Sequence, residues 1–112
     1  MCLFCRIIER KLPARIVHED ELSLAFEDIH PQAPVHLLVI PKKHIASTDS
    51  LSEADAAVVG HLFLVARDLA RARQIEKSGY RTVVNAGPDA GQSVLHVHLH
   101  LLGGRPMSWP PG

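Results

Sequence analysis

The amino-acid sequence predicts an α+β domain built around an antiparallel sheet. Two short strand patterns and a nearly continuous apolar run occupy the first half of the chain. A single long amphipathic pattern follows, and alternating strand patterns close the chain. Strands that are grouped on either side of one helix, rather than alternating with several, are typical of this class.

The bulk composition suits one folded domain spanning residues 1–112. The chain is 46% hydrophobic, and its 12 Lys and Arg balance 12 Asp and Glu. A neutral chain argues against a polyanion such as DNA or RNA as partner. The sequence holds no apolar run of about 18 residues and no secretory pattern, so we expect no membrane association and a cytoplasmic location. There, thiols or metal-ligating cysteines are expected rather than a disulfide.

The first half of the chain predicts one short helix and three strands. The helix covers residues 3–11 and stops ahead of Pro13, because a residue before proline is pushed out of the helical region. A loop over residues 28–34 contains two prolines and precedes the apolar run 35–40, which indicates a central strand that Pro41 closes. The other two strands are expected at 16–18 and 23–27, on either side of the acidic turn Glu19-Asp20-Glu21.

The second half predicts one long helix. Ser52 and Asp55 resemble a capping box at its start, and Gly79 is expected to stop it. His61 lies off the apolar stripe, so we expect a surface or half-buried histidine without chemistry. The stripe recurs at spacings of three and four residues, as an amphipathic helix requires, and comprises Val58, Leu62, Val65, Leu69 and Ala72.

Two further strands are expected near the C-terminus, at residues 80–85 and from His96 onward, separated by a loop over 86–93. In the second strand, His96, His98 and His100 alternate with apolar residues. Side chains of a strand alternate between faces, so the three imidazoles would share one face at a rise of roughly 6 to 7 Å per step. Such a row can bind a metal or transfer protons near neutral pH, because a free imidazole titrates at about 6.5.

The alternating histidines, followed by two leucines, resemble the signature of the histidine-triad superfamily. Other blocks are similar to its Hint branch, the histidine-triad nucleotide-binding proteins: Asp28-Ile29, Pro31-Gln32-Ala33-Pro34, residues 36–44, Val83-Val84-Asn85, Gly91-Gln92-Ser93 and Trp109-Pro110-Pro111-Gly112. The resemblance implies a purine nucleoside phosphoramidate hydrolase. It also implies a homodimer, whose five-stranded antiparallel sheet, with one short and one long helix per subunit, continues across the dimer.

The resemblance assigns the catalytic roles. His98 matches the nucleophile, which attacks the α-phosphorus and forms a nucleotidyl-histidine that water then hydrolyses. A backbone carbonyl in the same strand is expected to hold its other nitrogen. His36 should support the triad by hydrogen bonding. His100 should contact the phosphoryl and leaving groups, and Ser93 or His100 should protonate the departing amine.

The nucleotide-binding residues also follow from the resemblance. Asp28 matches the ribose-binding acid, and Trp109, on an extended tail, is expected to cover the leaving group in the partner's site. No carboxylate cluster suggests a catalytic metal. The phosphate is expected at Asn85, Gly91, Gln92 and Ser93, and the purine between Phe4, Ile7, Phe26 and Ile29.

Cys2 and Cys5 have a spacing typical of metal ligands. Many Hint proteins lack this pair, but the zinc-binding members of the superfamily add two histidines, which match His44 and His96 here. The resemblance therefore implies a structural Zn²⁺ with four protein ligands, which would pin the N-terminus to the sheet beside Phe4. The alternative is a frayed Cys2 and a small buried Cys5.

Two other functions remain open from the sequence alone. One is a dinucleoside polyphosphate hydrolase or phosphorylase of a neighbouring branch, against which Gln92-Ser93 and the Trp109 tail argue. The other is a nucleotide-binding interaction module whose hydrolysis is incidental. A sandwich of apolar side chains barely discriminates between purines, so the choice between AMP and GMP derivatives also stays open.

Overall fold

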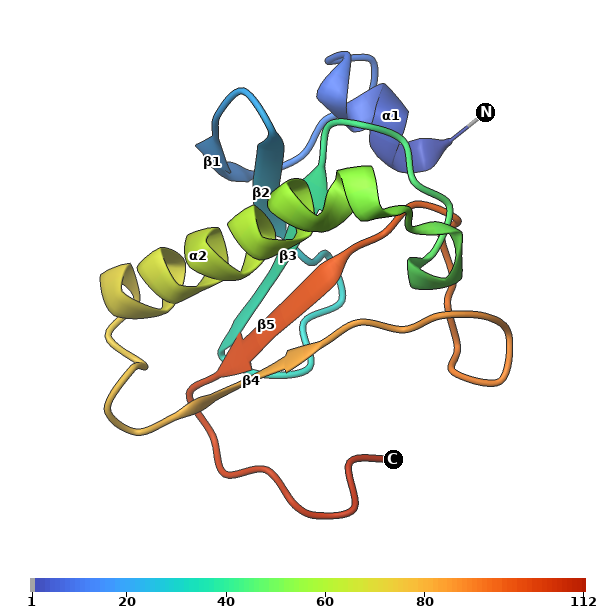
Figure 1. Ribbon diagram of the computed structural model, residues 1–112. Coiled ribbons are helices and arrows are strands. Elements are labelled where there is room, and N and C mark those ends of the chain that lie inside the picture. Colours follow the sequence, from blue (N-terminus) through green and yellow to red (C-terminus); the bar gives the residue numbers. More distant parts are fainter. Residues whose placement is uncertain (1) are drawn as a thin grey trace.

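The computed structural model describes residues 2–112 and contains a five-stranded antiparallel sheet (Figure 1). The strand order is β1-β2-β3-β5-β4. This arrangement confirms the predicted fold class and the central position of β3. The strands are β1 (Ile16–Glu19), β2 (Ser23–Glu27), β3 (Val35–Pro41), β4 (Tyr80–Val83) and β5 (Leu99–Gly103).

The long helix α2 (Ala56–Ala72) lies across one face of the sheet (Figure 1). The short turns η1 (Thr48–Ser50) and η2 (Glu53–Asp55) precede it, and the predicted capping box between Ser52 and Asp55 is present. The predicted stripe is buried at its centre, whereas Ala72 is exposed. The core beneath α2 consists of Leu62, Val65, Ala66, Leu69 and Ala70 of the helix and Ala25, Leu37, Val39, Leu99 and Leu101 of the strands.

The short helix α1 (Leu3–Ile8) packs Phe4 and Ile7 in a second cluster with Leu24, Phe26, Leu38 and Ile40. The predicted end at Lys11 is wrong, because Arg10 adopts a left-handed conformation with φ of 62°. Arg10 N–H then donates to Ile7 O at 3.0 Å, and Lys11 N–H donates to Arg6 O at 2.8 Å. This pair of hydrogen bonds closes the last turn of a helix. Helix α1 therefore ends before Pro13 can have any effect on it.

The expectation that Gly79 stops α2 is wrong for the same kind of reason. Gln74 has φ of 59°, and the N–H of Ile75 donates to Ala70 O at 3.0 Å, so the helix closes soon after Ala72. Ile75 then turns back into the core, where it is 5% exposed. Gly103 makes room for it, because a Cβ at that position would lie 2.5 Å from Ile75 Cδ1.

Both C-terminal strands are shorter than the sequence predicts. Strand β4 stops at Val83, and β5 starts at Leu99, so only His100 of the three alternating histidines lies in a strand. His96 and His98 occupy the segment before β5, where the N–H of Val97 bonds to Ile45 O at 2.7 Å. The ladder with β3 stops here because Pro41 has no N–H, and its carbonyl accepts from the His96 side chain instead.

Asp20 ties the β1–β2 hairpin to α2. Its Oδ2 accepts from His18 Nε2 and from His61 Nε2, both at 2.7 Å. Although burial opposes it, these bonds, with those from Leu22 N–H and Ser23, hold the pKa of Asp20 well below its ordinary value. His61 is half-buried as expected, but it has a structural contact that its sequence position did not indicate.

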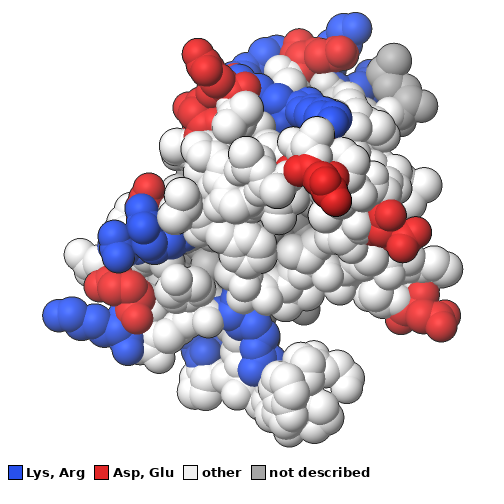
Figure 2. Space-filling model, in the orientation of Figure 1, with Lys and Arg blue, Asp and Glu red and all other residues white. Residues whose placement is uncertain are grey.

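The surface carries interspersed charges. On the face shown in Figure 2, acidic and basic side chains mix at the top and left, acidic ones alone follow the right side, and no continuous basic stripe runs across it. Among residues 2–112, no helix combines the length and the apolarity that crossing a bilayer requires.

Candidate active site and metal centre

His98 lies in a buried position between α1 and β5, with 4% of its surface exposed. Its Nδ1 is 2.7 Å from the backbone carbonyl oxygen of His96. A carbonyl can only accept, so Nδ1 carries the proton and the lone pair of the neutral ring is on Nε2. His98 therefore has the tautomer that leaves Nε2 free to attack. A backbone carbonyl holds the ring as expected, but this carbonyl belongs to the segment before β5 and not to a strand. The ring of His100 lies beside that of His98, with a centroid separation of 5.0 Å.

A chain of hydrogen bonds fixes the tautomers of His36 and His100 in the same way. The backbone N–H of Gln32 donates to His36 Nδ1 at 3.0 Å, which leaves the proton of His36 on Nε2. That nitrogen is 2.9 Å from His100 Nδ1 and 3.4 Å from Asp28 Oδ2. His100 Nδ1 consequently accepts, and its Nε2 keeps a proton that it can donate. The part played by Gln32 could not be predicted from its residue type, because its backbone N–H is the group that acts here.

Both of these histidines are neutral at physiological pH. Burial, with smaller contributions from His98 and His36, lowers the pKa of His100 to about 4. Burial also lowers the pKa of His36, against the opposing charge of Asp28. Asp28, His36 and His100 are close enough to hold a metal ion, but the hydrogen bond from His36 Nε2 already accounts for their approach.

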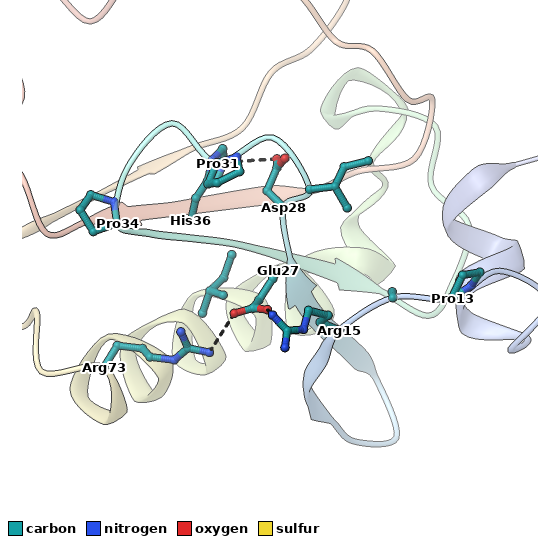
Figure 3. Close-up of a pocket in the computed structure, with 11 residues that line it drawn as sticks. Pro13, Arg15, Glu27, Asp28, Pro31, Pro34, His36 and Arg73 are labelled. Carbon is teal, nitrogen blue, oxygen red and sulfur yellow. Dashed lines mark ion pairs between the residues drawn. The ribbon is translucent and has the colours of Figure 1, made fainter.

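A cleft of about 600 Å³ opens beside Asp28 and His36 (Figure 3). Ile29, which is 85% exposed, lines it together with Pro13 and Ala14. On the other side of the strand, Glu27 forms ion pairs with Arg15 at 3.4 Å and Arg73 at 3.9 Å. Adjacent residues of an extended segment point in opposite directions, so the two neighbouring carboxylates face different parts of this cleft.

The four residues expected around the purine are not gathered together. Phe4, Ile7 and Phe26 are 5–7% exposed and belong to the cluster under α1, with the rings of Phe4 and Phe26 edge-to-face at 5.5 Å. Ile29 is not part of that cluster and lines the cleft.

The loop expected to hold the phosphate is organised by the side chain of Gln92. This amide accepts from Gly87 N–H at 3.0 Å and donates to Ala46 O at 2.7 Å and Val94 O at 3.1 Å. The N–H groups of Gly91 and Gln92 bond to Pro88 O and Gly87 O within the loop. Gly91 has φ of 81°, a conformation suited to glycine.

Two other residues expected near the phosphate lie outside this network. Ser93 is exposed and lines a second cleft, of about 460 Å³, together with Cys2 and His44. Asn85 is half-buried just beyond β4.

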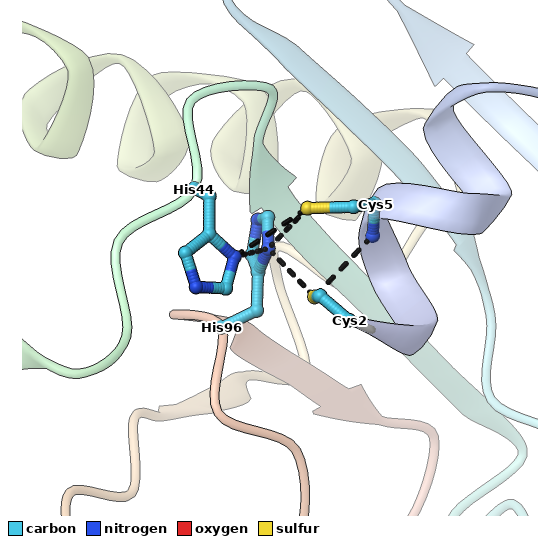
Figure 4. A group of neighbouring side chains, drawn as sticks. All are labelled: Cys2, Cys5, His44 and His96. Carbon is cyan, nitrogen blue, oxygen red and sulfur yellow. Dashed lines mark hydrogen bonds between the residues drawn. The ribbon is translucent and has the colours of Figure 1, made fainter.

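Cys2, Cys5, His44 and His96 point toward one another from α1, the loop after β3 and the segment before β5 (Figure 4). Their ligand atoms all lie within 4.8 Å of one another. The S···N distances are 3.3 Å for Cys2–His96, 3.4 Å for Cys5–His44 and 3.6 Å for Cys5–His96, and the two Nδ1 atoms are 3.2 Å apart. Tetrahedral zinc bonds of about 2.3 Å to sulfur and 2.05 Å to nitrogen imply edges of about 3.6 Å and 3.3 Å. The four residues therefore fit this ion.

The surroundings of the cluster support the same assignment. His96 Nε2 donates to Pro41 O at 2.8 Å, which leaves the lone pair of its Nδ1 aimed at the other three side chains. Burial, followed by the neighbouring Cys2 thiol, raises the pKa of Cys5 to about 11. Metal binding must therefore displace the Cys5 proton, and affinity will rise with pH.

Trp109 is 81% exposed on the C-terminal tail. Arg81 of β4 holds this tail, because its Nη1 donates to Ser108 O at 3.1 Å and its guanidinium lies 5.9 Å from the centre of the Trp109 ring.

Comparison with known proteins gives a consistent result over nearly the whole chain. The profile of the HIT domain matches residues 9–107. An uncharacterized HIT-like protein of Synechococcus elongatus is 53% identical over 98% of this chain and 96% of its own length. The crystal structure of a HIT family hydrolase from Legionella pneumophila superposes with a TM-score of 0.98, at 50% identity over 100% of both chains. A histidine triad nucleotide-binding protein from Candida albicans gives a TM-score of 0.84 at 30% identity, covering 98% of this chain and 83% of that one.

Proposed function

Because this chain belongs to the HIT domain family, we propose that it is a hydrolase of purine nucleoside phosphoramidates. Its substrates would be AMP-amine or AMP-lysine conjugates and aminoacyl adenylates, and its product the nucleoside monophosphate. The observation that carries this proposal is the bond from His98 Nδ1 to the His96 carbonyl. That bond presents an unprotonated Nε2 beside a second histidine able to donate a proton.

In the first step, His98 Nε2 attacks the α-phosphorus, and the bond from phosphorus to the substrate nitrogen breaks; in an aminoacyl adenylate the bond from phosphorus to the acyl oxygen breaks instead, and a carboxylate leaves. The departing amine needs a proton. His100 gives it from Nε2 once the anionic phosphate has favoured the imidazolium form, and is left neutral; the hydroxyl of Ser93 is the alternative donor. In the second step, water attacks the phosphorus of the nucleotidyl-histidine, and the proton of the water returns to the group that gave one up. The bond to His98 breaks, and the monophosphate leaves. His36 supports both steps by keeping His100 in the tautomer that donates from Nε2.

The cleft beside Asp28 receives the nucleoside. The Asp28 carboxylate accepts from the ribose hydroxyls, and Ile29 supplies an apolar contact to the purine, whereas Phe4, Ile7 and Phe26 stay packed in the cluster under α1. The Asn85 amide and the Ser93 N–H and hydroxyl serve the phosphate oxygens, where charge develops. Gly91 and Gln92 shape this loop, because their own N–H groups are already bonded within it.

Turnover of a substrate panel tests the proposal. We expect wild-type protein to release AMP from an AMP-amine conjugate far faster than from diadenosine tri- or tetraphosphate. A preference for the dinucleotides would instead assign the protein to the alternative, a dinucleoside polyphosphate hydrolase.

His98→Asn should abolish turnover while leaving AMP binding and the fold intact, because His98 supplies the nucleophile but only part of the phosphate contacts. Mass spectrometry of acid-quenched wild type should find a nucleotide on His98. Near-normal turnover by the variant would exclude covalent catalysis through this residue. If turnover stops but the inactive variant still replaces wild type in cells, the protein acts as a nucleotide-binding interaction module.

Trp109 is proposed to reach the leaving group in the partner subunit's site. Deleting residues 109–112 should change the relative kcat/KM of bulky and small amine conjugates more than the affinity for AMP. Arg81→Met, which removes the contacts that hold the tail, should shift the preference in the same direction. An unchanged preference in both variants would mean that the tail only packs against the surface.

The Cys2, Cys5, His44 and His96 cluster is proposed to bind one structural Zn²⁺ per subunit. The observed S···N and N···N distances support this ion. Zinc would contribute stability, because it binds the folded chain. Metal analysis of protein purified without chelators or a histidine tag, under reducing conditions, should give one zinc per chain. Chelation and the double variant Cys2→Ser, Cys5→Ser should lower Tm alike. We place the protein in the cytoplasm, where both thiols stay reduced.

A further inference from the structure

His96 connects the metal centre to the nucleophile through a single residue. Its Nδ1 faces Cys2 Sγ at 3.3 Å and His44 Nδ1 at 3.2 Å, while its Nε2 donates to the Pro41 carbonyl at 2.8 Å. Its own backbone carbonyl accepts from His98 Nδ1 at 2.7 Å. His96 is 0% exposed, and its backbone N–H bonds to Val94 O at 2.9 Å, so each of its polar groups has a partner within the protein.

Phe4 makes a second connection between the same two sites. It lies between Cys2 and Cys5 in the sequence, and its ring packs edge-to-face on both histidine rings, at 5.9 Å from His96 and 5.1 Å from His98. Phe4 is 5% exposed and can shift only with its neighbours. Fixing the two cysteines therefore also fixes the apolar side of the nucleophile.

We infer that His96 is a positioning residue, through which metal occupancy sets the orientation of His98 and hence kcat, rather than the affinity for the nucleotide. This inference rests on the proposed function. A misplacement of about 1 Å in a reacting group can cost about a hundredfold in rate. Asp28 and Ile29, which serve the nucleoside, line the other cleft and make no contact with the cluster, so KM should be insensitive to the metal.

The loss of metal changes what holds the His96 ring. Without an ion, His96 Nδ1 can accept from the cysteine S–H groups, or from His44 when that ring carries its proton on Nδ1. S–H groups are weak donors and His44 is exposed, so the ring is then held mainly by Pro41. The backbone carbonyl that accepts from His98 Nδ1 belongs to His96, so it is held less firmly once the His96 ring is less firmly held.

His44 offers a variant at a metal ligand outside the three alternating histidines, although it lines the same cleft as Ser93. It is exposed, and it approaches the triad only through the His96 ring. His44→Ala removes one ligand, whereas His44→Cys keeps a set of three cysteines and one histidine that also binds zinc. At a temperature where both variants are folded, we expect His44→Ala to lower kcat for an AMP-amine conjugate about tenfold or more, with KM within about twofold. His44→Cys should recover most of the lost kcat.

NMR supplies a readout that does not depend on turnover. In ¹⁵N-histidine-labelled protein, the Nδ1 proton of His98 should be protected from solvent exchange with zinc bound. It should exchange faster after chelation of wild type and in His44→Ala, and recover when zinc is added back to wild type. Chelation of wild type also covers the case in which His44→Ala fails to fold.

Three results would overturn the inference. A lower Tm with unchanged kcat would reduce the metal to a purely structural role. A raised KM with unchanged kcat would place its effect on the nucleoside cleft. Equal protection of the His98 proton with and without zinc would show that the metal does not affect how His98 is held. Failure of the proposed function can be told apart from failure of this inference. In the first case wild type would hydrolyse no phosphoramidate, but the NMR comparison would still show whether zinc protects the His98 proton.

Discussion

At the scale of single residues, the chemistry depends on which nitrogen of each histidine carries the proton. Backbone groups decide this in three places: the His96 carbonyl for His98, the Gln32 N–H for His36 and the Pro41 carbonyl for His96. The histidines themselves could be found from the sequence, because their alternation is a strong pattern. Of the backbone partners, only the carbonyl that holds His98 was expected, from the resemblance. Gln32 and Pro41 could not be found, because they act through a backbone N–H and a backbone carbonyl that carry no sequence signal.

Burial of neutral histidines makes stability depend on pH. Because the pKa of His100 is about 4 in the folded protein against an ordinary 6.5, the unfolded chain binds an extra proton between these values. Stability is therefore lost as pH falls from 6.5 toward 4, by about 1–2 kcal/mol at pH 5 for this residue. His36, whose pKa is also lowered, contributes in the same direction.

Urea unfolding of wild type and of His100→Gln, both in the presence of a chelator, measures the contribution of His100 to the pH dependence of stability. Wild type should lose more stability between pH 7.5 and pH 5 than the variant does. Parallel pH profiles for the two proteins would show that His100 is protonated in the folded state as readily as in the unfolded one.

At the scale of elements, the sequence predicted α1, α2 and the five strands but misplaced several ends, and it did not predict η1 and η2. The interior of α2 was predictable because its apolar period is local. The ends of both helices were not, since Arg10 and Gln74 adopt left-handed conformations that usually call for glycine. The start of β5 was missed because the His96 side chain bonds to Pro41 at the end of β3 and the N–H of Val97 bonds to Ile45, and only the folded chain brings these groups together.

The bond from His61 to Asp20 joins two elements that share few other polar contacts. His61→Ala should lower the free energy of unfolding by about 1–2 kcal/mol, because Asp20 stays half-buried with one partner fewer. Arg71→Ala, at an exposed position on the same helix, is the control and should change stability little. Urea unfolding at neutral pH makes the comparison. Equal effects in the two variants would mean that water replaces His61 at no cost.

At the scale of the whole molecule, one edge of the sheet and one side of α2 suit a second copy of this chain. Strand β4 has β5 as its only neighbour in the sheet, and Tyr80 is 40% exposed at its start. Phe63 and Leu64 are 47% and 50% exposed on α2. We propose that these surfaces meet in a homodimer near the two-fold axis, which would extend the sheet and protect its edge.

The oligomeric state tests this arrangement. Phe63→Glu with Leu64→Glu should convert a dimer to a monomer in sedimentation velocity, because a charge would be buried at the interface. Leu22→Glu is the matched control: Leu22 is 46% exposed on the β1–β2 turn, at the opposite edge of the sheet. A dimer that survives the double substitution, or a wild-type monomer, would contradict the proposal.

The pairing of β3 with β5 also determines when during folding the site comes into being. Strands β1, β2 and β3 are neighbours both in the sequence and in the sheet, so they can pair after closing only short loops. Residues 35–39 must instead find residues 99–103 across most of the domain, and such a closure is slow because of its entropy. His36 meets His100, and His44 meets His96, only after that encounter. A nascent chain that still lacks its last strand therefore has neither nucleophile nor metal ligands in place, and activity reports completed folding.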